Sequence, residues 1–138
     1  MRFLLDICVI ADAAKATKFP RLAEWLGAQA NDDLAIGALT LGEFRFGVQR
    51  LATGRRREAL KRWIHAELDP LFAERVLPID EPVAMAWALL RATGDDAGRP
   101  LPVIDGLLLA TAQVHGLTFV TRNLADVEGR GVSVLSPY

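Results

Sequence analysis

Four acidic residues, far apart along the chain, occupy positions from which carboxylates can do chemistry. They are Asp6, Glu43, Asp105 and Asp126. Three of them come soon after a short apolar run, and ligands of parallel α/β sheets bind outside the carboxyl ends of the strands. Clustered carboxylates repel one another and are costly to desolvate, so a fold that gathers them usually offsets the repulsion with a cation. Oxygen ligands suit Mg²⁺ or Mn²⁺, which also bind phosphate oxygens, so the pattern predicts metal-dependent phosphodiester chemistry.

Each acid also has a purely structural interpretation. Asp6 can simply end a strand, and Asp126 can be a solvated turn residue. Thr40 and Glu43 have the spacing of a capping box, in which Thr40 caps a helix and Glu43 returns a hydrogen bond. Asp105 can be a first-turn acid favoured by the helix dipole. Residue patterns alone leave both interpretations open for all four acids.

Short apolar runs alternate with helical patterns, and together these elements must position the acids. Strands are predicted at residues 3–5, 34–37, 76–79, 117–120 and 132–135. Pro78 indicates that the third of these is an edge strand. Helical spacing occurs over residues 41–51, 60–71, roughly 82–92 and 105–115, with the last helix ending at Gly116. Strands separated by helices predict an α/β fold whose mostly parallel central sheet is covered on both faces.

Composition indicates one globular domain. The chain has 138 residues, of which 51% are hydrophobic and 24% charged, and its formal net charge is −1. A single cysteine, Cys8, with two histidines excludes an internal disulfide and a closed Cys/His zinc site, which favours a reducing compartment. Asp6 interrupts the first apolar run where a signal peptide would need its apolar core, and no segment has membrane-spanning length. We therefore expect a cytoplasmic protein without a membrane partner.

Positive charge gathers in one stretch, residues 45–62, which has a local charge of +6 against −7 for the rest of the chain. Its only acid is Glu58. Its basic residues are Arg45, Arg50, Arg55, Arg56, Arg57, Lys61 and Arg62. A basic stretch beside an acidic body favours phosphate binding, and the five residues from Arg45 to Arg57 are predicted to contact RNA. A solvated helix, or a surface for an acidic protein, is the alternative.

Four motifs, each carrying one of these acids, follow one another along the chain at residues 3–10, 39–48, 101–112 and 116–126. A fifth stretch, residues 131–138, follows them and reads Gly-Val-Ser-Val-Leu-Ser-Pro-Tyr. In this order and at these separations they resemble the PIN-domain nucleases, specifically the VapC toxins of bacterial toxin–antitoxin pairs and their FitB-like relatives. The resemblance spans nearly the whole chain, so we expect residues 1–138 to form one PIN domain.

The resemblance implies a three-layer α/β/α fold, a homodimer, and an endoribonuclease that depends on Mg²⁺ or Mn²⁺. Carried onto matching positions, the catalytic and metal-binding carboxylates are Asp6, Glu43, Asp105 and Asp126. Some relatives have an acid where this chain has Asn123, whereas relatives reading Thr-Arg-Asn supply it three residues later, here as Asp126. Asn123 and Thr121 then become supporting residues.

The same resemblance implies hydrolysis of RNA that leaves a 5′-phosphate and a 3′-hydroxyl. It also implies a small VapB-like antitoxin whose C-terminal segment occupies a groove and places a basic side chain among the acids.

This chain departs from the family pattern at three positions. Ile7 and Cys8 stand where the family commonly has Thr and Asn, and Val127 replaces a Phe. Loss of a hydroxyl and an amide beside Asp6 removes hydrogen-bonding capacity, so a degenerate PIN domain that binds RNA or antitoxin without cutting is the alternative function. A phospho-acceptor receiver domain is disfavoured, because its chemistry needs a late lysine and the last one here is Lys61.

Overall fold

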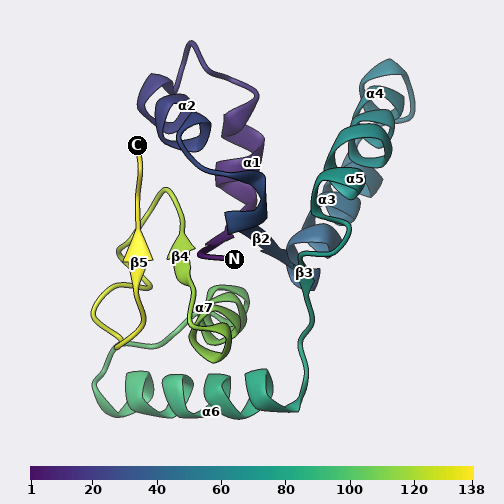
Figure 1. Ribbon diagram of the computed structural model, residues 1–138. Coiled ribbons are helices and arrows are strands. Elements are labelled where there is room, and N and C mark those ends of the chain that lie inside the picture. The colour runs from purple at the N-terminus through teal and green to yellow at the C-terminus, as the bar shows by residue number, and fades with distance from the viewer.

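The computed structural model describes residues 1–138 and has a five-stranded sheet in which every strand pair is parallel (Figure 1). The strands are β1 (Phe3–Leu5), β2 (Leu34–Gly37), β3 (Val76–Leu77), β4 (Thr118–Val120) and β5 (Val134–Leu135). Their order in space is β3-β2-β1-β4-β5. The predicted strands are thus confirmed, and the one containing Pro78 is shortened to two residues at an edge, since proline cannot donate to the ladder.

Seven α-helices surround the sheet. They are α1 (Ile7–Ala13), α2 (Pro20–Gly27), α3 (Ala38–Arg50), α4 (Arg55–Trp63), α5 (Asp69–Phe72), α6 (Glu81–Asp96) and α7 (Val103–His115). The four predicted helical stretches are confirmed, and α7 ends as expected at Gly116, which adopts a left-handed φ of 66°. Helices α1 and α2 were not anticipated. The apolar residues of β1 are followed, after Asp6, by the apolar residues of α1. The hydrophobic pattern therefore shows no change at the point where the strand ends and the helix begins.

Alternate residues of each strand face two separate cores. Phe3 and Leu5 of β1 join a core built with α1, α2 and α3, whereas Leu4 joins a second core built with α6 and α7. Side chains of successive strand residues point to opposite faces, so this division places helices on both sides of the sheet. The predicted three-layer α/β/α arrangement is confirmed.

Helices α3, α4 and α5 stand together as an arm that projects to one side of the sheet (Figure 1). A π-helical turn, η2 (Ile64–Leu68), joins α4 to α5, and the amide of Asp69 bonds to the Ile64 carbonyl five residues back. Pro70 follows in the first turn of α5 and has no amide to donate. Asp69 also accepts from Arg45 of α3 at 3.0 Å, so the two sides of the arm are tied together.

Helices α6 and α7 cross closely beneath the sheet (Figure 1). Gly106 of α7 lies at the contact, where an added Cβ would come within 2.9 Å of Leu101 and 3.1 Å of Trp87 of α6. The lack of a side chain at this position therefore lets α7 approach α6, one residue after Asp105. None of the helices has the length and apolar character that a bilayer crossing requires.

Candidate functional site

Asp6 follows β1 directly and caps the N-terminus of α1. Its Oδ1 accepts from the backbone amide of Ile7 at 2.8 Å, and its Oδ2 accepts from the hydroxyl of Thr121 at 2.8 Å. Thr121 follows β4, the neighbour of β1 in the sheet, so the parallel pairing brings the two residues together. The carboxylate is therefore held in one orientation from two strand ends.

Cys8 adds a weaker contact to the same carboxylate. Its sulfur lies 3.6 Å from Oδ2 of Asp6 and 3.7 Å from the Thr121 hydroxyl. Burial, supported by the charge of Asp6, raises the pKa of the Cys8 thiol, so the thiol stays protonated and can donate at neutral pH. The departures at Ile7 and Cys8 thus leave Asp6 with donors, because a backbone amide serves whatever side chain stands at position 7.

Glu43 lies on α3, and its predicted capping-box role is wrong. The N-cap of α3 is Gly37 with no side-chain cap bond, so Thr40 already lies inside the helix. The hydroxyl of Thr40 and the Oε1 of Glu43 are both buried without a hydrogen-bond partner. Burial raises the pKa of Glu43, and the charges of Asp6 and Asp105 raise it further. Such an orphaned, repelled carboxylate fits a cation ligand.

Asp105 lies in the first turn of α7, and Asp126 lies in the exposed loop between β4 and β5. Burial raises the pKa of Asp105, followed by the charges of Asp6 and Asp126. The charge of Asp6 therefore acts on both Glu43 and Asp105, and the charge of Asp126 acts on Asp105. No three His, Cys, Asp or Glu side chains lie close enough together to enclose a metal ion in this conformation.

The two supporting residues predicted from the sequence have different surroundings. Thr121 is buried and bonded to Asp6. Asn123 is exposed, and its Oδ1 accepts from the amide of Ala125 at 3.0 Å, which is the bond of an Asx turn. Asn123 therefore shapes the loop that leads to Asp126.

Comparison with known proteins fits this arrangement. A family model described as PIN domain matches residues 3–125. Toxin FitB of Neisseria gonorrhoeae is 34% identical over 135 residues, which are 98% of this chain and 97% of that protein. The chain belongs to the PIN domain family. VapC ribonuclease Y4jK of Sinorhizobium fredii is 32% identical and is matched over 98% of this chain and 96% of its own length.

Solved structures agree with the sequence relatives of this PIN domain. The crystal structure of FitAcB from Neisseria gonorrhoeae matches with a TM-score of 0.92 and 34% identity, covering 98% of this chain and 97% of that chain. A toxin-antitoxin complex from Klebsiella pneumoniae matches with a TM-score of 0.73 and 25% identity, covering 98% and 97% of the two chains.

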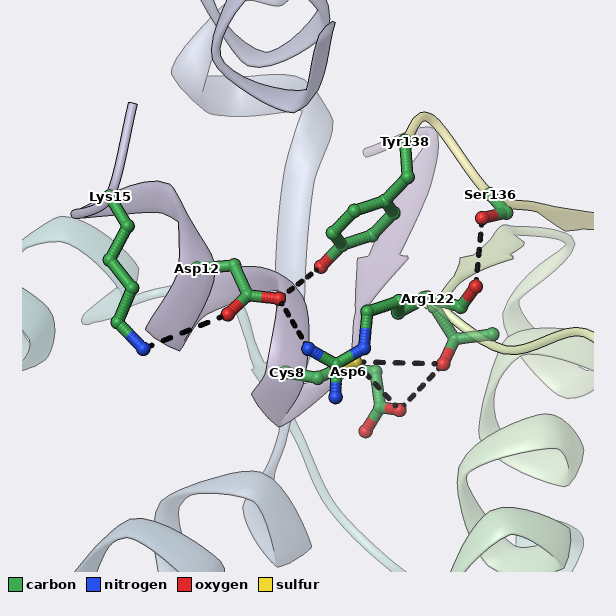
Figure 2. A network of polar contacts seen from close by, with 8 residues as sticks. Asp6, Cys8, Asp12, Lys15, Arg122, Ser136 and Tyr138 are labelled. Atoms are coloured by element: carbon green, nitrogen blue, oxygen red, sulfur yellow. Dashed lines mark hydrogen bonds and ion pairs between the residues drawn. The ribbon is translucent and has the colours of Figure 1, made fainter. Parts of the chain in front are cut away.

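Near Asp6, the PIN domain contains a polar network that sequence patterns did not reveal (Figure 2). Its centre is Asp12, which is only 5% exposed. The Asp12 Oδ2 accepts from Arg122 at 3.1 Å and from the Tyr138 hydroxyl at 2.9 Å. The Ser136 hydroxyl donates to the carbonyl of Arg122 at 2.9 Å. The segment after β5 therefore contacts Arg122 directly and through Asp12, and Arg122 is the residue that follows Thr121.

The predicted RNA-binding arginines lie along the projecting arm. Arg45 is paired with Asp69, and Arg57 donates to Gln49 at 2.7 Å, so these two brace the arm itself. The other three are exposed and make no ion pair; they are Arg50, Arg55 and Arg56. Phosphate contacts are therefore best expected from these three.

An apolar groove of about 640 Å³ opens between α1 and the arm. Twelve of its fifteen lining residues are hydrophobic, including Val9 and Ile10 of α1 and Trp63 and Phe72 of the arm. Apolar grooves of this kind accept the apolar side of a helix or an extended segment.

Proposed function

We propose that this chain is the toxin of a toxin–antitoxin pair and a divalent-metal-dependent endoribonuclease that hydrolyses RNA phosphodiester bonds. The observation that carries the proposal is the Oε1 atom of Glu43, which is buried without a hydrogen-bond partner in a carboxylate whose pKa is raised by burial and by the charges of Asp6 and Asp105, while Asp126 acts in the same way on Asp105. Relatives that match almost the full chain are named as a toxin and as a VapC ribonuclease, which supports the same conclusion.

The residues that would hold Mg²⁺ or Mn²⁺ are Asp6, Glu43, Asp105 and Asp126. A bound ion of this kind activates water and stabilises charge on the departing oxygen. Their all-oxygen donor set is the one these hard cations prefer.

Other residues of the chain orient the site and the substrate. Thr121 and the amide of Ile7 fix both oxygens of Asp6. Burial and the charges of Asp6 and Asp105 raise the pKa of Glu43, so its carboxyl holds a proton more readily than an exposed glutamate when no cation neutralises its neighbours. Arg50, Arg55 and Arg56 would contact the RNA backbone.

The proposed partners are a VapB-like antitoxin, RNA and a second copy of the chain. The apolar groove between α1 and the arm supports docking of an antitoxin segment. Met85 and Leu89 lie one turn apart on α6 and are 62% and 72% exposed, which supports a homodimer. We further propose that residues 1–138 form one PIN domain, since β5 completes the sheet, and that it acts in the cytoplasm, where an unpaired thiol stays reduced.

The test is cleavage of total cellular RNA by purified protein freed of antitoxin, with Mg²⁺, Mn²⁺ or EDTA and with the cut ends mapped. Asp6→Asn and Asp105→Asn are compared with Asp95→Asn, an exposed acid on α6. Metal-dependent cuts lost in the first two variants but not in the third are expected. RNA that is bound but not cut by folded, metal-loaded protein would instead establish the binding-only PIN domain.

A further inference from the structure

Two arginines interlock the segments that carry Asp105 and Asp126. Arg99 lies in the linker between α6 and α7, a few residues before Asp105. Its Nη1 donates to the carbonyl of Glu128 at 2.6 Å, and its Nη2 donates to the carbonyl of Ala125 at 2.6 Å. These two carbonyls flank Asp126, so the guanidinium spans the turn that presents this acid.

Arg130 makes one contact within its own loop and two contacts back to the linker. Its Nε donates to the carbonyl of Asp126 at 2.7 Å, and its Nη1 donates to the carbonyl of Arg99 at 3.1 Å. Its Nη2 lies 3.5 Å from the carbonyl of Pro100. The bonds therefore run in both directions between the two segments.

Neither guanidinium forms an ion pair with an acid. All five contacts go to backbone carbonyls, so the hydrogen bonds of Arg99 and Arg130 hold the path of the chain and leave the carboxylate oxygens of the acids unoccupied. The planar fork of arginine can reach two carbonyls at fixed separation, which a lysine ammonium cannot do.

The loop that carries Asp126 needs such a restraint. Asp126 is exposed, and its main anchor in the core is the neighbouring Val127, which is 2% exposed. Gly129 and Gly131 have positive φ values of 72° and 80°, so the loop turns sharply beyond that anchor. The charge of Asp126 repels that of Asp105, and this repulsion favours separation of the two segments.

We propose that Arg99 and Arg130 form a latch that holds Asp126 beside Asp105 before a cation binds. In this role they are positioning residues: they touch neither substrate nor metal, but they reduce the cost of gathering the two carboxylates. The inference rests on the proposed function, because it takes both acids as ligands of the metal.

Gly94 of α6 provides an independent way to disturb the latch. A Cβ added there would lie 2.6 Å from the carbonyl oxygen of Arg99 and 2.7 Å from Nη1 of Arg130. The Gly94→Ala variant would therefore wedge the two arginines apart while leaving every acid and both guanidinium groups in the chain. Gly27→Ala is the matched control, because an added Cβ there meets no atom within 4 Å.

The test measures Mn²⁺ binding to the RNA-free protein by calorimetry, together with amide exchange of residues 122–131. Arg99→Lys and Arg130→Lys keep the charge but lose the fork, and Arg91→Lys, on the exposed face of α6, is their control. In the two latch variants and Gly94→Ala, we expect Mn²⁺ affinity to fall on the order of tenfold. Exchange should quicken in 122–131 while α1 and α3 stay protected.

Two results would overturn the latch, and they differ from each other. If the wild-type protein binds Mn²⁺ and the variants bind it equally well and exchange their amides equally slowly, the latch proposal is wrong and the metal site stands. If the wild-type protein binds no Mn²⁺, the proposed metal site is wrong, and the latch then has no role in metal binding.

Discussion

Thr121 is the residue that most directly fixes a predicted ligand, because its hydroxyl donates to Asp6 at 2.8 Å. We expect Thr121→Val to lower kcat/KM for RNA cleavage by about 10- to 100-fold, as loss of a residue that orients a ligand typically does. Thr121→Ser retains the hydroxyl and should recover most of the activity. Cys8→Ala should cost less than about threefold, since a thiol at 3.6 Å is a weak donor. Equal losses in the valine and alanine variants would contradict this ranking.

Glu43 should destabilise the metal-free protein as the pH rises. Burial and the charges of Asp6 and Asp105 raise the pKa of Glu43 in the folded state. The folded state then binds more protons than the unfolded state, so the free energy of unfolding falls from about pH 4 upward through the raised pKa.

Glu43→Gln removes the part of this dependence that Glu43 contributes and leaves the part that comes from the raised pKa of Asp105. In EDTA at neutral pH its Tm should exceed that of the wild type, by about 4 °C if the gain is about 1 kcal/mol. Thermal scans from about pH 4 to about pH 8 check this, with Asp95→Asn as an exposed control. A glutamine variant that melts below the wild type at neutral pH would show that the Glu43 carboxylate stabilises the folded protein despite its burial and the repulsion from its neighbours.

At the scale of elements, the segment after β5 is joined to α1 by the Tyr138–Asp12 hydrogen bond (Figure 2). Burial and the neighbouring carboxylate raise the pKa of Tyr138, so the phenol remains a donor throughout the working pH range. Tyr138→Phe keeps the ring contact with Phe19 but leaves a buried carboxylate with one donor fewer.

We expect Tyr138→Phe to lower the free energy of unfolding by about 1–3 kcal/mol in urea titrations. Thr118→Ala, which removes an exposed hydroxyl contact with Ser133, should change it by about 0.5 kcal/mol or less. A double-mutant cycle with Asp12→Ala, which leaves no side-chain acceptor at position 12, isolates the coupling between the two groups. Additive effects in that cycle would mean that the hydrogen bond contributes nothing to stability.

At the scale of the molecule, the exposed arginines Arg50, Arg55 and Arg56 belong to the arm that projects beside the sheet (Figure 1), whereas Asp6 follows the carboxyl end of β1. This separation suits a protein that holds the RNA backbone with one region and cuts it with another. The arm is stiffened by its own contacts, such as Arg45 with Asp69, so its exposed arginines are presented on a rigid element.

Replacing Arg50, Arg55 and Arg56 with Gln should weaken binding of single-stranded RNA, measured by anisotropy in the cleavage-deficient Asp105→Asn background. The slope of log K against log salt should fall in magnitude by about 0.7 for each phosphate that the variant no longer neutralises. The matched control replaces three exposed arginines on other elements, Arg2, Arg21 and Arg91. A control whose affinity falls as far as that of the arm variant would mean that the arm has no special role.

Much of this architecture was predictable because it depends on local patterns. Short apolar runs separated by helical periods are enough to predict a parallel sheet with helices on both faces. The same rule places Asp6 at a strand end without any knowledge of tertiary contacts. Helix α1 escaped prediction because its apolar residues continue those of β1, so the two elements form one uninterrupted pattern. The assignment of the acids as metal ligands stays a prediction.

Contacts between distant residues were decided only by the tertiary structure. Thr40 and Glu43 have capping-box spacing, but helix α3 begins at Ala38, so the sequence pattern misplaced its cap. Asp12 meets Arg122 and Tyr138 across more than a hundred residues, and no local pattern indicates that these side chains come together. Sequence periodicity reports which face of an element is buried, whereas the partner of a buried polar group depends on how the strands are ordered in space.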